Sequence, residues 1–258
     1  MLLVTLRWAI VLLILVFIAH KAIRKDWPVL KTNLRLLMIL GALGFTAFNA
    51  LYYMAAQSTT ALNLGIVQGT MPALVLLGSM IAYRTKIGLV QAVGVLITLC
   101  GVLIVTSEAN LETLKRFAFK QGDVLVFLAC VLYAGYTLWL RKRPDVDPLS
   151  LLSVMAVAAF LSSIPLAVAE AVTGALLMPS IKGWVIVFLV ALLPSLLAQF
   201  LFIRGVQVIG PERAATFVNL VPVMAAIFAV YFLGETFALY HGISLSIVLF
   251  GIWLSERT

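Results

Sequence analysis

Residues 218–236 of this chain read VNLVPVMAAIFAVYFLGET, and residues 67–85 read VQGTMPALVLLGSMIAYRT. Each stretch has polar or small residues ahead of a proline, then an apolar run, then a polar end. The two prolines, Pro72 and Pro222, are 150 residues apart (222 − 72). An apolar run of about 20 residues is long enough to cross a bilayer. The pair therefore predicts a membrane protein built from two related halves.

The composition supports a location in the bilayer. The chain is 64% hydrophobic and 11% charged, with a mean hydropathy of +1.15, whereas about a quarter of the residues of a soluble domain are charged. The apolar runs are continuous, which is typical of membrane helices and not of an outer-membrane barrel. We expect an all-α, multi-pass protein with nine membrane helices, at 2–19, 33–55, 60–83, 88–106, 121–141, 148–169, 182–204, 211–233 and 237–254.

The net charge of +8 could indicate a nucleic-acid partner, but the placement of the basic residues gives a different explanation. Membrane proteins concentrate Lys and Arg in their cytoplasmic loops. Assigning alternate loops to the cytoplasm leaves 13 of the 18 basic residues (18 − 5) on that side. The charge therefore predicts a topology with the C-terminus in the cytoplasm, and no nucleic-acid partner. The five basic residues on the other side are Arg7, Lys115, Arg116, Lys120 and Lys182.

The repeat extends well beyond the two quoted stretches. At the same offset of 150 residues, Gln57 matches Gln207, Gly101 matches Gly251, and Asn49 meets Gln199. No gap is needed from residue 33 to residue 102. Internal repeats of this kind are a signature of secondary transporters. We expect one repeat at 1–107 and a second at 121–258.

The second repeat begins with a segment that has no counterpart in the first. The segment at 121–141 would match residues ahead of Met1, so we expect a parent architecture of five plus five helices, with four plus five in this chain. A start site placed too late, a fragment and a natural variant would each explain the difference. Because five is odd, successive five-helix units enter the membrane from opposite sides, which predicts inverted repeats.

The stretches IGPERAATF (209–217) and NLVPVMAAIFAVYFLGE (219–235) resemble the EamA-type transporters of the drug/metabolite transporter superfamily. Arg7-Trp8 is similar to the arginine on the second helix of that family. The chain departs from the family pattern at Arg84-Thr85, which stands where the second half has Gly234-Glu235, and in its missing first helix, which bears on its competence for transport. A weaker first-half copy of the pattern contains Pro72, Gln91, Gly94 and Gly101.

The resemblance implies a central cavity between the third, fourth, eighth and ninth helices of a ten-helix scheme. Polar side chains in lipid need partners or water, so polar residues at mid-depth on these helices are candidates for lining the cavity. Asn49 and Gln199 occupy equivalent positions in the two repeats. Asn219 lies three residues before Pro222, whose missing N–H frees a carbonyl near Val218. Cavity lining is the prediction for Asn49, Tyr53, Tyr133, Gln199, Thr216 and Asn219.

Each of these residues also has a structural interpretation. Amides in helix bundles often bond between helices, Asn219 could repair the backbone beside the proline, and Tyr133 could pack in the core. Small residues at helical spacing favour close helix packing. We expect structural or gating roles for Pro72, Pro222, Gly94, Gly101, Gly251 and Glu235.

The positions of the acidic residues argue against a proton-carrying carboxylate at the centre of the membrane. Asp123, Glu170, Glu212 and Glu235 all lie near the ends of the expected helices, whereas a drug/proton antiporter built on a central carboxylate needs an acid within the membrane. Acids at helix ends can still face a cavity, so proton coupling, facilitation and exchange all stay open.

The sequence contains no motif that is typical of an enzyme active site. It contains two histidines and neither an H-E-x-x-H nor a G-x-S-x-G motif, so we expect no metal, no cofactor and no catalytic residue. The favoured function is a carrier in the bacterial plasma membrane that exports a small, amino-acid-like metabolite by alternating access. The alternative is a non-transporting scaffold that lacks the first helix. The expected partners are the solute and membrane lipid, and a second copy of the chain stays open.

Overall fold

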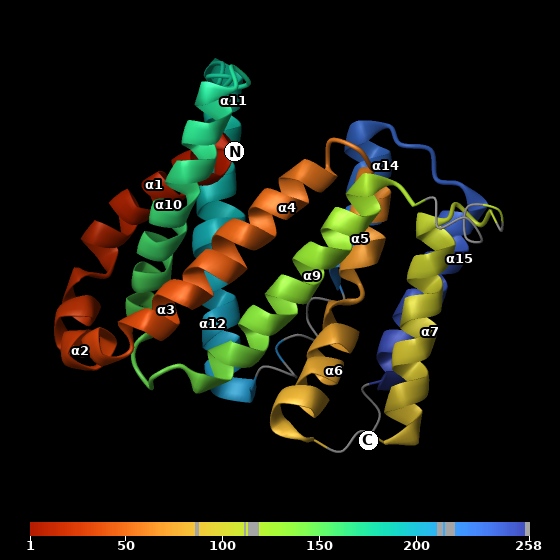
Figure 1. Ribbon diagram of the computed structural model, residues 1–258, viewed down its shortest axis with the longest axis horizontal. Helices are drawn as coiled ribbons and strands as arrows, with labels where there is room; N and C mark the ends of the chain where they lie inside the picture. Colours follow the sequence, from red (N-terminus) through yellow and green to blue (C-terminus); the bar gives the residue numbers. More distant parts are fainter. Residues whose placement is uncertain (86–87, 111, 113–118, 211–213, 215–219, 256–258) are drawn as a thin grey trace. The chain divides into compact units, whose positions relative to one another are not determined.

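The computed structural model describes residues 1–85, 88–110, 112, 119–210, 214 and 220–255. Its secondary structure over these residues is helical, with no strand among them (Figure 1). The helices of the first half are α1 (Leu2–Ile18), α2 (His20–Thr32), α3 (Leu34–Gly41), the π-helix η1 (Ala42–Ala47), α4 (Phe48–Ala55), α5 (Ala61–Gln68), α6 (Met71–Tyr83) and α7 (Leu89–Thr106).

The helices of the second half follow in the same manner. They are α9 (Gln121–Trp139), the 3-10 turn η2 (Leu140–Lys142), α10 (Pro148–Val172), α11 (Ile181–Val190), the π-helix η3 (Ala191–Leu197), α12 (Ala198–Ile209), α14 (Leu220–Leu233) and α15 (Leu239–Ser255).

Several helices begin where the sequence supplies a capping group. The side chains of Thr60, Asp147 and Ser180 accept hydrogen bonds from the backbone N–H groups in the first turns of α5, α10 and α11, which satisfies donors that have no partner within the helix. Pro148 occupies the first position of α10, where its missing N–H does no harm. Pro72 plays the same part at the start of α6, after the break that ends α5.

Six continuous helical segments within the described residues are long and apolar enough to cross a membrane: Leu34–Ala55, Ala61–Tyr83, Leu89–Thr106, Gln121–Lys142, Pro148–Val172 and Ile181–Ile209. The bent pair α1 and α2 would make a seventh, and α14 and α15 are shorter apolar helices. The expected multi-pass helical protein is confirmed at this level. The count of nine membrane helices stays a prediction.

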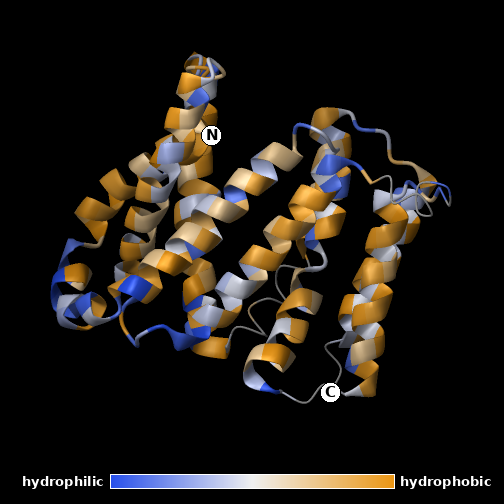
Figure 2. Cartoon of the chain, in the orientation of Figure 1, coloured by the Kyte–Doolittle hydropathy of each residue, from blue (hydrophilic) through white to orange (hydrophobic). Residues whose placement is uncertain are grey.

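The segment at 20–32 is a helix, where the sequence analysis expected a charged loop. α2 turns by 98° from the end of α1, and it buries Leu30 while its lysines lie exposed. The Asp26 carboxylate accepts a hydrogen bond of 3.0 Å from the backbone N–H of Asp147. Figure 2 shows hydrophilic residues concentrated on α2. An amphipathic helix that turns sharply away from an apolar one is typical of the membrane interface.

The helices pack into two compact units. Unit 1 comprises residues 1–50 and 139–211, and unit 2 comprises residues 51–138 and 212–258. Each unit therefore takes helices from both halves of the sequence. These units are defined by packing, so the repeat boundaries at 1–107 and 121–258 stay a prediction.

In unit 2, α7 and α15 lie side by side (Figure 1). A β-carbon added at Gly251 would lie 2.5 Å from the backbone nitrogen of Thr98, and one added at Gly101 would lie 3.0 Å from the backbone nitrogen of Val248. The contacts pair rising numbers on one helix with falling numbers on the other, so the helices are antiparallel. Only glycine lets two backbones approach this closely.

α5 and α14 of unit 2 also pair in an antiparallel manner. A β-carbon added at Gly65 would collide with the side chain of Ala225. The Glu235 carboxylate accepts hydrogen bonds from the backbone N–H groups of Ala61, at 2.8 Å, and Leu62, at 3.0 Å. An anion at this place offsets the positive end of the α5 dipole.

In unit 1, α1 packs against α10, again antiparallel. The backbone N–H of Leu2 donates to Glu170 at 2.7 Å, and the Thr5 hydroxyl donates to the carbonyl of Ser163 at 3.2 Å. The π-helix η1 also packs on α10, where the Thr46 hydroxyl donates to the carbonyl of Ala159 at 2.9 Å. The π-helix η3 packs on α1. The two π-helices thus pack on the two members of the α1–α10 pair.

Candidate functional site

An arginine lies buried between the apolar helices of unit 1. The side chain of Arg7, on α1, is 4% exposed, and one of its terminal nitrogens donates a hydrogen bond of 3.1 Å to the Oδ1 atom of Asn49 on α4. Asn49 is itself buried. Because a charge within apolar helices is costly, an ionisable residue at such a place points to function and not to packing alone.

Two aromatic rings fix this pair in position. The Trp8 and Phe45 rings stack with their centroids 4.7 Å apart and their planes inclined by 11°, and both side chains are fully buried. The amide nitrogen of Asn49 donates to the carbonyl of Phe45 at 2.5 Å, which orients its Oδ1 atom toward Arg7.

Both amides that the sequence analysis singled out follow a π-helix. Asn49 is the second residue of α4, which follows η1, and Gln199 is the second residue of α12, which follows η3. Both residues belong to unit 1. π-Helical turns within α-helices are frequent at functional sites because they redirect side chains. The two amides that the 150-residue offset pairs thus each follow a π-helix.

The cause of the second π-helix can be read from two adjacent residues. Pro194 has no N–H to donate to the carbonyl of Val190 four residues earlier. The hydroxyl of Ser195 donates to that carbonyl instead, at 2.8 Å. The freed carbonyl is therefore satisfied by a side chain, and the helix continues in the wider π geometry.

Gln199 presents an open hydrogen-bonding atom. Its Oε1 atom is shielded from solvent and has no hydrogen-bond partner among the described residues. A buried amide oxygen left unpaired costs about 1–3 kcal/mol, so a polar solute that bonds to it would recover this energy.

The chemistry of these side chains suits a carboxylate. A guanidinium carries five N–H donors in a planar fork, which matches the two oxygens of a carboxylate. An amide adds both a donor and an acceptor, as an amino-acid-like solute would require. Among the described residues, no three His, Cys, Asp or Glu side chains lie together as metal ligands.

The other predicted cavity residues lie elsewhere or outside the described residues. Tyr53 and Tyr133 belong to unit 2, and the ring of Tyr133 lies 5.2 Å from that of the buried Tyr136. Thr216 and Asn219 fall outside the described residues. The structure therefore brings Asn49 into contact with Arg7, and the cavity role of all six residues stays a prediction.

The residues expected to be structural occupy contact positions. Gly94, Gly101 and Gly251 lie at the closest approach of α7 and α15. Pro72 lies at the start of α6, and Pro222 is buried in α14. A gating role for any of them stays a prediction.

The sequence analysis did not include Arg7 among the cavity residues. It treated this residue as a loop-side charge and as a family feature. A signal was present, because an arginine interrupts an otherwise apolar run from residue 2 to residue 19. What the sequence lacked was the identity of its partner, 42 residues along the chain.

Comparison with known proteins shows the family of the chain. The model of the EamA-like transporter family matches residues 1–107 and 120–257. Two Bacillus subtilis proteins, "Uncharacterized transporter YyaM" and "Uncharacterized transporter YetK", are each 27% identical to the chain. The alignments cover 95% of the chain and 79% of YyaM, and 96% of the chain and 74% of YetK. A protein of known crystal structure matches with a TM-score of 0.69 at 18% identity, over 99% of this chain and 86% of its own, and this likeness concerns the fold alone.

Proposed function

Because the chain belongs to the EamA-like transporter family, we propose that it carries a small metabolite bearing a carboxylate, such as an amino acid, across the membrane. The family and the names of both relatives make it a transporter and not an enzyme. The solute class, export and alternating access are our proposals. A non-transporting scaffold is not better supported by these comparisons.

The observation that carries the proposal is the buried contact between Arg7 and Asn49. A guanidinium held at 3.1 Å from an amide within apolar helices is expensive to maintain, and recognition of an anionic group gives it a use. The nearby π-helices favour the same region. We propose that Arg7 binds the solute carboxylate and that Asn49 and Gln199 bond to its other polar groups.

The proposed mechanism rests on inverted repeats. If the halves are related by a shift of 150 residues, Thr98 corresponds to Val248 and Gly101 to Gly251. The shift then converts the contact of Gly101 with Val248 into the contact of Gly251 with Thr98, and the reverse. A two-fold axis perpendicular to an antiparallel helix pair has this effect, and such an axis in the membrane plane relates inverted repeats. The antiparallel pairing of α1 with α10 agrees with it.

The proposed location is the bacterial plasma membrane, with the C-terminus in the cytoplasm. The excess of Lys and Arg in alternate loops supports this orientation. The partners are then the solute and the surrounding lipid. Export is proposed from the resemblance to bacterial EamA-type transporters.

Reconstitution tests the proposal directly. The purified chain in liposomes is offered labelled L-amino acids and, in parallel, their methyl esters and the corresponding amines. We expect exchange of at least one free acid and none of its ester. Equal movement of acid and ester would contradict carboxylate recognition, and movement of no solute from a broad metabolite panel would contradict the carrier.

A further inference from the structure

Asp123 is a buried carboxyl for which the proposed solute site has no use. It lies in the first turn of α9, in unit 2, and is 2% exposed. Its Oδ1 atom accepts hydrogen bonds from the Thr59 hydroxyl, at 2.5 Å, and from the Asn63 amide nitrogen, at 3.4 Å. Its Oδ2 atom has no hydrogen-bond partner among the described residues. One oxygen therefore ties α9 to the start of α5, while the other is buried and open.

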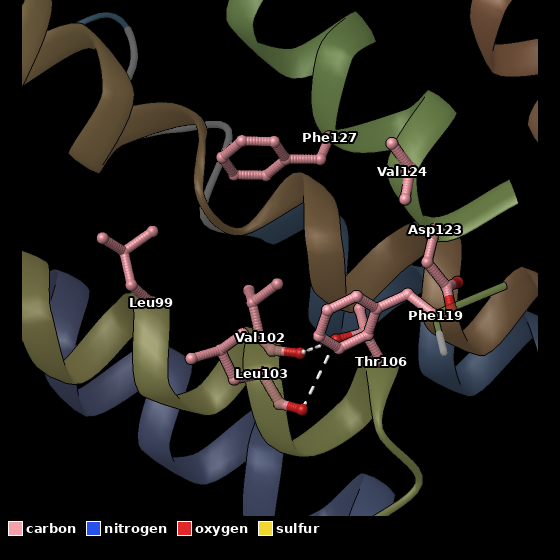
Figure 3. Close-up of a pocket in the computed structure, with 8 residues that line it drawn as sticks. All are labelled: Leu99, Val102, Leu103, Thr106, Phe119, Asp123, Val124 and Phe127. Atoms are coloured by element: carbon pink, nitrogen blue, oxygen red, sulfur yellow. Dashed lines mark hydrogen bonds between the residues drawn. The ribbon is translucent and has the colours of Figure 1, made fainter. Parts of the chain in front are cut away.

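The carboxyl borders an apolar cavity of about 340 Å³ (Figure 3). Side chains of α7 form one side of this cavity and side chains of α9 the other, with Phe119 beside Asp123. The Thr106 hydroxyl turns back to the carbonyl of Val102, at 2.9 Å. Asp123 is the one ionisable side chain among the eight lining residues, which are Leu99, Val102, Leu103, Thr106, Phe119, Asp123, Val124 and Phe127.

Within the part of the chain that the structure describes, the charged groups near Asp123 have hydrogen-bond partners of their own. Lys120 and Glu108 form an ion pair of 2.5 Å, and this hydrogen bond raises the pKa of Lys120. Both groups are close enough to Asp123 to interact with it electrostatically, as is Tyr240 of α15. The neighbouring His241 accepts a hydrogen bond from the backbone N–H of Ala238. Glu235 is bonded to the backbone at the start of α5.

The amide of Asn63 fits a protonated neighbour. Its Oδ1 atom is buried and has no partner among the described residues, while its nitrogen makes a long bond to Asp123. The two ends of an amide are assigned from hydrogen bonds. With the amide reversed, Asn63 Oδ1 would face the carboxyl and accept a hydrogen bond from it, an arrangement that only the protonated acid can make.

We propose that Asp123 is a proton-binding site coupled to solute movement, a proposal that rests on the carrier function above. In the arrangement described here the carboxyl is closed off from water and holds a proton. When the first turn of α9 separates from α5, water reaches Asp123, the O–H bond breaks and the proton leaves as hydronium. Because hydration favours the carboxylate, opening and deprotonation promote each other.

The geometry favours a proton over a metal cation. Hard cations take about six or more oxygen ligands. Asp123 and Asn63 offer two unpaired oxygens, whereas a proton needs a single carboxyl oxygen.

The first test uses N,N′-dicyclohexylcarbodiimide, an apolar reagent that reacts with protonated carboxyls. The carboxyl proton moves to a carbodiimide nitrogen, and the carboxylate oxygen bonds to the central carbon. Mass spectrometry of the purified full chain should find the adduct at Asp123, with loss of the adduct as pH rises. Glu170 and Glu235 are the internal controls, because both side chains accept hydrogen bonds from backbone N–H groups, which Asp123 does not among the described residues.

Two variants test whether the label is attached to the carboxyl of residue 123. Asp123→Asn keeps the shape of the side chain and should lose the adduct, while Asp123→Glu should keep it. A folded wild-type chain that is labelled equally at every pH, or not labelled at Asp123 at all, would overturn the proton site. This result does not depend on any solute.

The second test separates coupling from carriage in liposomes, with labelled L-amino acids as probes. Asp123→Asn should retain exchange at zero pH gradient and lose the accumulation that a pH gradient drives. Wild-type accumulation that ignores the pH gradient, or follows sodium instead, would overturn the coupling and leave the carrier standing. Absence of all exchange in the wild type would count against the carrier, and the labelling result would still decide on the proton site.

Discussion

At the scale of single residues, the proposed function depends most on one arginine. Arg7 is almost wholly buried within an apolar helix, where a charge is costly. The amide of Asn49 and the ring stack of Trp8 and Phe45 hold its surroundings in one arrangement. Because such a preorganised group loses little entropy on binding, it suits recognition of a small anion.

Replacing Arg7 by lysine tests whether the shape of the donor matters. Lysine keeps the positive charge but loses the planar fork. We expect Arg7→Lys to slow solute exchange by about tenfold or more, which corresponds to about 1.4 kcal/mol of binding free energy. Exchange in liposomes is the measurement, and Arg35→Lys, at an exposed position, is the control. Equal rates for Arg7→Lys and the wild type would remove the guanidinium from the site.

The two equivalent amides allow a matched pair of substitutions. Asn49→Ala and Gln199→Ala each remove one amide that follows a π-helix. We expect both variants to reach the membrane at wild-type abundance and to exchange solute more slowly, by about five- to thirty-fold for a loss of about 1–2 kcal/mol. Quantitative blotting and exchange assays measure the two properties. Wild-type exchange in both variants would leave the amides with a packing role.

At the scale of elements, helices in this protein meet through small residues and through backbone irregularities. Gly251 leaves no room for a side chain beside Thr98 of α7. The π-helix η3 arises where Ser195 replaces the donor that Pro194 lacks. Helix pairing therefore depends on single positions within long apolar runs.

A substitution at Gly251 should separate α7 from α15. Gly251→Val places a branched side chain 2.5 Å from the Thr98 backbone, and overpacking of this kind lowers stability by about 1–3 kcal/mol. We expect a lower thermal denaturation temperature in detergent. Gly135→Ala is the matched control, since a β-carbon there meets nothing within 4 Å and alanine favours the helix. A denaturation temperature for Gly251→Val equal to that of the control would contradict the close approach.

At the scale of the whole molecule, each packing unit draws helices from both halves of the sequence. α1 pairs with α10, and α7 pairs with α15, each time antiparallel. The 150-residue offset pairs α1 with α10 and α7 with α15, and the proposed inverted repeats require such pairs to be antiparallel.

Thiol labelling tests the inversion. Two variants are made in a chain with Cys100 and Cys130 replaced by alanine. One carries Thr85→Cys and the other Thr236→Cys, in the turns that the two halves are proposed to share. We expect a membrane-impermeant maleimide to label Thr236→Cys in intact cells and Thr85→Cys only after permeabilisation, because Arg84 and Lys86 mark the cytoplasmic side. Labelling of both positions from the same side would end the inverted-repeat proposal.

The sequence by itself determined the membrane class, the places of the apolar helices and the resemblance to a transporter family, because these depend on local hydropathy and on residues kept in register. It could not anticipate that residues 20–32 form an amphipathic helix at 98° to α1, since charge alone does not distinguish a loop from an interfacial helix. Only the tertiary structure brought Asn49 to Arg7 and closed Asp123 against Thr59, across 42 and 64 residues of chain. Contacts between distant residues depend on how the helices pack, which the sequence does not show. The cost of a charged or polar group depends on its burial, which is also known only from the packed structure.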